Sequence, residues 1–143
     1  MNCEANWSLD PRLAGDTVAA GDLTLCRVLA MNDANYPWLI LVPRRPGLTE
    51  IIDLDAPDQA ALMRDLDRAA RGLKSLTRCD KLNVAALGNS VRQLHVHVIA
   101  RFKADAAGAR PVWGAAPAKP YEAVALDTFV TRVRGALGLP PSS

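Results

Sequence analysis

The two histidines of this chain, His95 and His97, are separated by one residue and stand where polar and apolar residues alternate. This alternation predicts a half-buried β-strand over 91–101. Side chains two positions apart share one face of a strand, so Gln93, His95 and His97 are expected in a row, with neighbours roughly 6–7 Å apart along the backbone. Imidazole is suited to nucleophilic, acid–base or metal chemistry near neutral pH. This row is therefore the first candidate site.

The spacing alone leaves other interpretations open. Two histidines on one strand face also occur as ordinary core or surface polar residues. A His-x-His pair can supply two zinc ligands, but the chain has no further histidine, so a metal site would need distant cysteine or carboxylate ligands. We therefore predict no metal and no cofactor, and we keep a His-x-His metal-binding protein as an alternative.

Length and composition favour one domain with few classes of partner. The 143 residues are expected to form a single domain over 1–143, and half of them are hydrophobic. The 17 basic and 15 acidic residues leave a net charge of +2, so duplex nucleic acid is not expected as a partner. The longest apolar run, 38–42, is too short to span a bilayer, so no membrane partner is expected either.

The cysteines and the N-terminus favour a cytoplasmic location. Cys3, Cys26 and Cys79 are odd in number and far apart, which fits reduced thiols better than a disulfide framework. Residues 1–10 are polar and lack the apolar stretch of a signal peptide. We therefore expect a cytoplasmic protein.

Periodicity and turn residues predict the elements that must position the histidines. Strands are predicted over 17–20, 23–31, 38–42, 81–87 and 91–101. The last two are expected to form a hairpin joined by a tight turn at 88–90. A long helix with an apolar stripe is expected to begin after Asp55 and to end near Cys79.

The remaining segments complete the predicted fold. Residues 1–14 are expected to be irregular or a short helix, 103–120 to be a loop, and 121–138 to hold a C-terminal helix. The order of elements predicts an α+β fold, with a mostly antiparallel five-stranded sheet, one long helix and a C-terminal helix.

The segment from Gly88 to Ile99 resembles the sequence motif of the histidine-triad (HIT) family of nucleotide hydrolases and transferases. That motif reads H-φ-H-φ-H-φ-φ, where φ is apolar, and usually follows a Gly-[Gln/Asn]-[Ser/Thr]-Val turn. A register with His95 as the first triad member would leave Ile99 as the third. The flanks, Val91-Arg92-Gln93 and Val98-Ile99, favour Gln93 as the first member, His95 as the middle one and His97 as the third.

The resemblance implies a HIT-like domain and a catalytic set of Gln93, His95 and His97. His95 would be the nucleophile that attacks an α-phosphorus and forms a covalent nucleotidyl-histidine, which splits one hard displacement into two easier ones. The main-chain carbonyl of Gln93 would orient His95, and His97 would hold a phosphate oxygen. Glutamine can donate a hydrogen bond but cannot act as a titrating acid, which favours substrates with a good leaving group.

The resemblance also implies a substrate-binding set of Asn32, Asn89, Ser90 and Trp38. Asn89 and Ser90 offer polar groups to developing charge in the manner of an oxyanion hole. Asn32 would contact the ribose. Trp38 would flank the nucleoside, although a residue that begins an apolar strand is more often part of the core. For Trp113, in the predicted loop, two placements are open: near a partner subunit's site, or on the surface of its own domain.

As substrates, the resemblance implies dinucleoside polyphosphates or nucleoside phosphoramidates, and it implies a homodimer. Because the first triad position is Gln93, a nucleotide-binding module with little or no catalysis stays as the alternative function.

Overall fold

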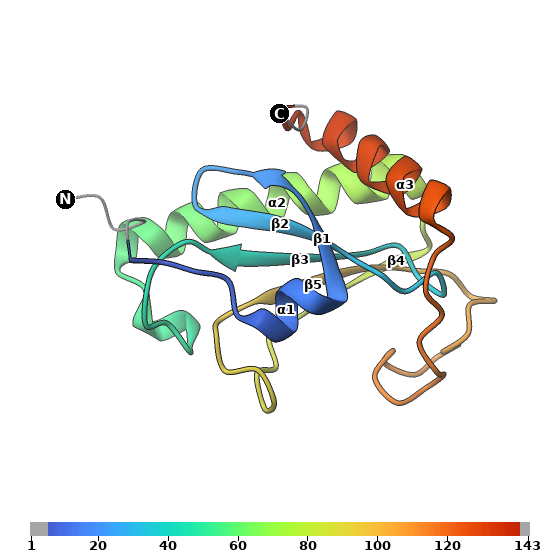
Figure 1. Cartoon of the computed structure of the whole chain (residues 1–143), viewed down its shortest axis with the longest axis horizontal. Helices are drawn as coiled ribbons and strands as arrows, with labels where there is room; N and C mark the ends of the chain where they lie inside the picture. Colours follow the sequence, from blue (N-terminus) through green and yellow to red (C-terminus); the bar gives the residue numbers. More distant parts are fainter. Residues whose placement is uncertain (1–5, 141–143) are drawn as a thin grey trace.

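A computed structural model of the chain describes residues 6–140 and shows one antiparallel sheet (Figure 1). Its strands lie in the order β1-β2-β3-β5-β4, and every neighbouring pair is antiparallel. The strands are β1 (Thr17–Asp22), β2 (Cys26–Met31), β3 (Trp38–Pro43), β4 (Lys81–Ala85) and β5 (Val96–Arg101). The helices are α1 (Pro11–Asp16), the 3-10 helix η1 (Ile51–Asp53), α2 (Ala56–Thr77) and α3 (Ala123–Leu137).

The core has two apolar clusters, one on each face of the sheet. The helices α2 and α3 cover one face, where Val98 of β5 is fully buried. The opposite face lies under α1 and residues 107–115, and it buries Ile40 and Ile99. His97 pairs with Ile40 in the register of β3 and β5 and lies two residues before Ile99. Because alternate residues of a strand point to opposite faces, His97 stands on this second face.

The central strand and the long helix form where their residue patterns predict them. All six residues of β3 are buried, as expected for an apolar strand covered on both faces. The Asp55 side chain accepts a hydrogen bond from the Asp58 N–H at 2.9 Å and caps α2. The helix ends at Thr77, followed by the C-cap Arg78, whose φ of 53° is left-handed. Its buried residues Leu62, Ala69 and Leu73 face the core.

The last two strands of the sheet, β4 and β5, are shorter than predicted, and the prediction of a tight turn between them is wrong. β5 begins at Val96, not at residue 91, and β4 ends at Ala85, so ten residues (86–95) connect them instead of a tight turn at 88–90. The Leu94 N–H donates to the Leu48 carbonyl at 3.0 Å, which ties this segment to the loop before α2. His95 therefore lies in the connection, one residue before the strand.

The N-terminal elements also differ in detail from the prediction. β1 continues through Asp22 with a bulge near Gly21, and β2 begins at Cys26. The Asp65 carboxylate on α2 accepts hydrogen bonds from the Leu25 and Cys26 N–H groups at 2.9 and 2.8 Å, which ties the start of β2 to α2. Residues 1–14 are predicted to be irregular or a short helix, and a short helix, α1, begins at Pro11 and extends to Asp16, two residues past that segment. The C-terminal helix α3 spans Ala123–Leu137, within the range expected for it, and residues 103–120 contain no helix or strand.

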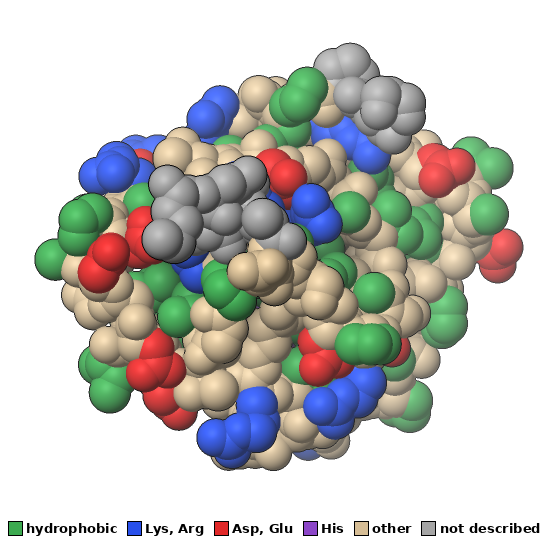
Figure 2. All heavy atoms as spheres, turned by 60° about the vertical axis from the view of Figure 1, so that its left-hand side comes forward, with side chains coloured by type: hydrophobic (Ala, Val, Ile, Leu, Met, Phe, Trp, Pro, Cys, Tyr) green, Lys and Arg blue, Asp and Glu red, His purple; other side chains and the backbone are tan. Residues whose placement is uncertain are grey.

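The surface carries mixed charge. Figure 2 shows Lys and Arg side chains interspersed with Asp and Glu on one face of the molecule. Within residues 6–140, no helix combines the length and apolar character needed to cross a membrane. Cys26 and Cys79 are buried free thiols, and Cys3 lies outside the described residues.

Candidate functional site

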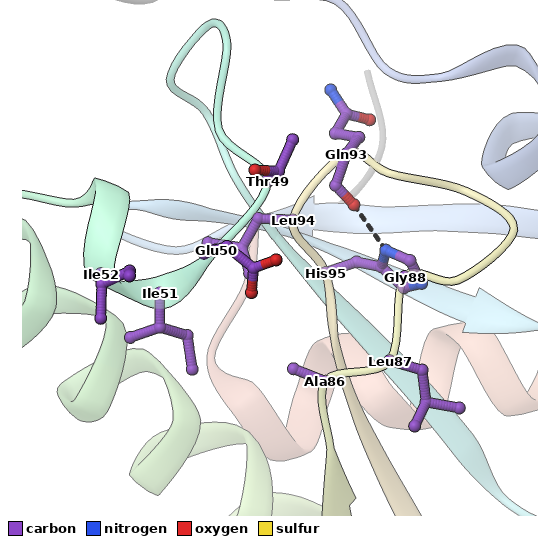
Figure 3. Close-up of a pocket in the computed structure, with 10 residues that line it drawn as sticks. All are labelled: Thr49, Glu50, Ile51, Ile52, Ala86, Leu87, Gly88, Gln93, Leu94 and His95. Carbon is purple, nitrogen blue, oxygen red and sulfur yellow. Dashed lines mark hydrogen bonds between the residues drawn. The ribbon is translucent and has the colours of Figure 1, made fainter.

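The ring of His95 is held in one tautomer by the main chain. Its Nδ1 lies 2.6 Å from the Gln93 carbonyl oxygen (Figure 3). A carbonyl oxygen can only accept a hydrogen bond, so Nδ1 of His95 carries the proton. In the neutral ring, Nε2 then keeps its lone pair. The orienting hydrogen bond expected from the sequence is therefore present, and it leaves an unprotonated nitrogen for chemistry.

His97 is held in the opposite tautomer. The indole Nε1–H of Trp38 donates to Nδ1 of His97 at 3.0 Å, and an indole nitrogen can only donate. The proton of neutral His97 is therefore on Nε2. Burial, and secondarily the charge of His95, lower the pKa of His97 to about 4, so this ring is neutral at physiological pH. The pair thus presents one acceptor nitrogen, on His95, beside one donor nitrogen, on His97.

His97 is in contact with three aromatic rings, those of His95, Trp38 and Trp113. The centroids of the His95 and His97 rings lie 5.0 Å apart with an interplanar angle of 74°. The Trp113 ring lies edge-on to His97 at 4.9 Å and to Trp38 at 5.8 Å, while 39% of Trp113 remains exposed. Trp113 therefore packs on the site of its own chain, which is the second of the two placements expected for it.

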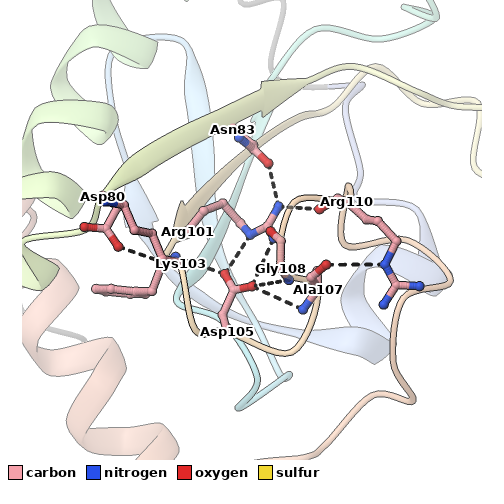
Figure 4. A network of polar contacts seen from close by, with 9 residues as sticks. Asp80, Asn83, Arg101, Lys103, Asp105, Ala107, Gly108 and Arg110 are labelled. Carbon is pink, nitrogen blue, oxygen red and sulfur yellow. Dashed lines mark hydrogen bonds and ion pairs between the residues drawn. The ribbon is translucent and has the colours of Figure 1, made fainter.

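A buried ion pair fixes the loop that carries Trp113 (Figure 4). The Arg101 guanidinium, at the end of β5, pairs with the Asp105 carboxylate at 2.8 Å, and both side chains are at most 7% exposed. Arg101 also donates to the Asn83 side chain and to the carbonyls of Gly108 and Arg110, each at 2.8 Å. Because these bonds join β4, β5 and the loop, they set the position of the chain that leads to Trp113.

Two cavities meet at His95. One, of about 330 Å³, is lined by both histidines, Trp38 and Trp113, and by residues of α1 and of the strands β1–β3. The other, of about 280 Å³, lies between the 86–95 connection and residues 49–52, and its single charged lining residue is Glu50 (Figure 3). His95, Leu87 and Gly88 line both cavities. A molecule that spans the two cavities would therefore pass the His95 side chain.

The structure brings most of the expected site residues together. Asn89, Ser90 and Trp38 line the larger cavity with His95 and His97. Asn32 is not among its lining residues, and its side-chain oxygen accepts a hydrogen bond from the Tyr121 N–H at 2.9 Å.

Gln93 lines the smaller cavity, but its side chain is directed away from the His95 ring (Figure 3). The Gln93 carbonyl, in contrast, faces that ring. The main-chain carbonyl of Gln93 therefore orients His95, while its side-chain amide makes hydrogen bonds to another part of the molecule.

Sequence reasoning missed the wall of the larger cavity opposite the motif. This wall is formed by Leu13 and Asp16 of α1, Thr17 of β1 and Met31 of β2. The Asp10-Pro11 pair signals the start of α1, but no sequence pattern indicates that α1 packs beside the histidines. Across residues 6–140, no group of three or more His, Cys, Asp or Glu side chains is arranged to hold a metal ion.

In comparisons with known proteins, the chain matches one family model and several solved structures. The model of the HIT domain family matches residues 14–104. A solved histidine triad protein from Bradyrhizobium japonicum is 54% identical and covers 92% of this chain and 98% of its own, with a TM-score of 0.89. Another, from Sinorhizobium meliloti 1021, is 44% identical and covers 93% of this chain and 98% of its own, with a TM-score of 0.90.

One curated relative is similar over part of the chain. The AP-4-A phosphorylase of Mycobacterium tuberculosis is 35% identical over 98 residues, which are 64% of this chain and 49% of the relative. The chain thus spans about half the length of that relative.

Proposed function

Because the chain belongs to the histidine-triad (HIT) family, we propose that it is a nucleotide phosphohydrolase or nucleotidyl transferase that acts at an α-phosphate. The observation that carries this proposal is the opposed tautomers of the two histidines. His95 presents a lone pair on Nε2, and its neighbour His97 presents an N–H. A nucleophile beside a hydrogen-bond donor is the arrangement that attack on a phosphoryl group requires.

The proposed reaction has two displacements at phosphorus. In the first, the Nε2 lone pair of His95 forms a bond to the α-phosphorus, and the bond from phosphorus to the leaving group breaks, with its electron pair going to the leaving group, which takes a proton from water when it is an amine. In the second, water or another acceptor attacks the phosphorus, loses a proton to solvent, and the electron pair of the P–N bond returns to Nε2. The His97 N–H would donate to a non-bridging oxygen in both steps, assisted by Asn89 and Ser90.

The proposed substrates are dinucleoside polyphosphates or nucleoside phosphoramidates. Gln93, which we place at the first triad position, cannot protonate a leaving group, which favours dinucleoside polyphosphates, because their leaving group departs as a stable anion, whereas the amine of a phosphoramidate needs a proton from water. The relative named AP-4-A phosphorylase supports the first class. In this proposal the nucleoside occupies the larger cavity and the leaving group the smaller one. Asn32 does not line the larger cavity, so its proposed contact with the ribose rests on the sequence resemblance, and it would be made through the amide nitrogen because the side-chain oxygen already accepts the bond from the Tyr121 N–H.

The experiment that tests the proposal looks for the covalent intermediate. The protein is mixed with an adenosine 5′-phosphoramidate, quenched at alkaline pH because phosphohistidine is acid-labile, and its intact mass is measured. We expect one nucleotidyl group per chain on His95, decaying as AMP appears. AMP binding with neither an adduct nor turnover would instead establish the alternative, a nucleotide-binding module, which the occupied amide of Gln93 favours.

We also propose that the protein is a homodimer formed through the edge strand β4. A groove of about 600 Å³ between η1, α2 and β4 is lined mostly by apolar residues. Three of them, Ile51, Met63 and Val84, are 44%, 63% and 48% exposed. Exposed apolar side chains that line one groove at a sheet edge are typical of an interface.

Replacing Val84 with lysine is expected to weaken the dimer. A charge placed in the apolar groove would lose hydration on association, so the dimer dissociation constant should rise at least about tenfold. Light scattering at several concentrations measures it. Val124→Lys is the matched control, because Val124 is 78% exposed on α3 and does not line the groove. A dimer unaffected by Val84→Lys, or a monomeric parent protein, would contradict this interface.

A further inference from the structure

The side chain of Gln93 joins the histidine motif to the N-terminal segment. Its Oε1 accepts a hydrogen bond from the Asp10 N–H at 2.8 Å, and its Nε2 donates to the Ser8 carbonyl at 2.8 Å. These partners lie 83 and 85 residues away in the sequence. Both kinds of polar group on the amide are therefore used, and neither is turned toward the His95 ring (Figure 3).

The segment held by Gln93 leads directly into the wall of the larger cavity. Asp10 is the N-cap of α1, and its carboxylate accepts a hydrogen bond from the Arg12 N–H at 2.8 Å. The helix then places Leu13 and Asp16 against the cavity. At its far end, the Asp16 carbonyl accepts a hydrogen bond from the Asn32 N–H at 3.0 Å. The six-residue helix α1 is thus anchored at both ends, and Gln93 supplies the anchor nearest the motif.

We propose that Gln93 is a positioning residue that holds α1 as a wall of the nucleotide cavity, so that its side chain governs nucleotide affinity more than the chemical step. This inference rests on the proposed function in one respect, that the larger cavity takes the nucleotide. It gives the side chain at this triad position a task separate from that of its main-chain carbonyl, which orients His95.

The chemistry of the amide suits this task. Glutamine carries an acceptor and a donor side by side on one planar group at the end of a flexible stem, and the two backbone partners present one N–H and one carbonyl. Methionine has a similar length and shape but makes neither bond. Histidine carries its two nitrogens on different sides of a ring, so it cannot meet both backbone groups at once. Gln93→Met and Gln93→His should therefore both release the segment.

The test measures nucleotide affinity, kinetics and local exchange separately. For Gln93→Met and Gln93→His, we expect the dissociation constant for AMP, measured by calorimetry, to rise about tenfold, as loss of two hydrogen bonds that position a wall predicts. The KM of the phosphoramidate should rise by a similar factor, while kcat changes much less. Hydrogen exchange at the Asp10 amide should accelerate, while exchange in β3 stays slow.

A matched control is available on α2. Gln59 also donates from its side chain to backbone carbonyls, those of Leu54 at 3.1 Å and Ile51 at 3.4 Å. It lines neither cavity beside His95, and the groove that it does line, at β4, takes no nucleotide in this proposal. Gln59→Met should leave the AMP affinity and the Asp10 exchange rate unchanged. Equal effects of the two Gln→Met changes would overturn the proposal, because general destabilisation would then explain both.

The remaining outcomes separate this inference from the proposed function. A higher kcat in Gln93→His with unchanged AMP affinity would overturn the positioning role and assign the position to acid catalysis. Unchanged exchange at Asp10 in Gln93→Met would overturn the anchor itself. A parent protein that binds AMP without turnover would contradict the enzymatic proposal, yet a loss of affinity in Gln93→Met would still support the positioning role.

Discussion

Replacement of His95 by glycine is expected to lower turnover of a nucleoside phosphoramidate by at least about 10⁴-fold. The physical reason is that His95 lines both cavities and that the Gln93 carbonyl holds the proton of its neutral ring on Nδ1, so Nε2 is the nitrogen that can attack. Removing the ring removes the proposed nucleophile but leaves both cavities. The dissociation constant for AMP should therefore change less than about threefold, as calorimetry can establish.

Two further measurements sharpen this prediction. Free imidazole added to the glycine variant should restore part of the turnover, because a small nucleophile can occupy the vacated space. His97→Gln should lower turnover less, by about 10²–10³-fold, since it changes a hydrogen-bond donor and leaves the nucleophile in place. Turnover in His95→Gly within tenfold of the parent protein would rule out His95 as the nucleophile.

The fold could be predicted from the sequence where local pattern and burial agree. The apolar run 38–42 becomes β3, and the stripe after Asp55 becomes α2, because each pattern matches the period of its element. Alternation also placed His97 on the correct strand, β5. The α+β architecture expected for a HIT-like domain is thereby confirmed.

The features that were missed depend on contacts between distant segments. The motif reads as a continuous strand over 91–101, but the chain before Val96 is drawn into other contacts, with Leu94 bonded to Leu48 and Gln93 to Ser8. The wall formed by α1 follows from the same long-range bonds. Local periodicity carries no information about contacts between residues 85 positions apart, so the larger cavity could be found only from the structure.

The Arg101–Asp105 pair leads to the second large expected effect, on stability. Arg101→Met should lower the free energy of unfolding by about 3–5 kcal/mol, because it leaves a buried carboxylate without its cation. Four acceptors would lose guanidinium donors: Asp105, Asn83, Gly108 and Arg110. Since this network sets the loop before Trp113, exchange of the loop amides should also accelerate. Chemical denaturation and hydrogen exchange measure the two effects.

A second arginine of the chain provides the matched control. Arg71 pairs with Asp67 at 2.9 Å, and this pair has the same spacing of four residues as Arg101 and Asp105. Its side chains are 80% and 58% exposed, against 7% and 4% for the buried pair. Arg71→Met should therefore change stability by less than about 0.5 kcal/mol. Similar losses in the two variants would contradict the special role given to burial.

The pH dependence of the stability lost in Arg101→Met shows how much of that loss is electrostatic. The hydrogen bond from Arg101 is the main cause that lowers the pKa of Asp105 from 3.8 to about 2. A lowered carboxyl pKa contributes stability that is present above about pH 4 and disappears as pH falls through about 2. The difference between the parent protein and Arg101→Met should therefore shrink between pH 4 and 2. Buried His97, with a pKa lowered to about 4, destabilises both proteins alike as pH falls from about 6.5 to 4, so it cancels in this difference. A difference that stays constant from pH 7 to 2.5 would instead assign the loss to packing of the Arg101 side chain.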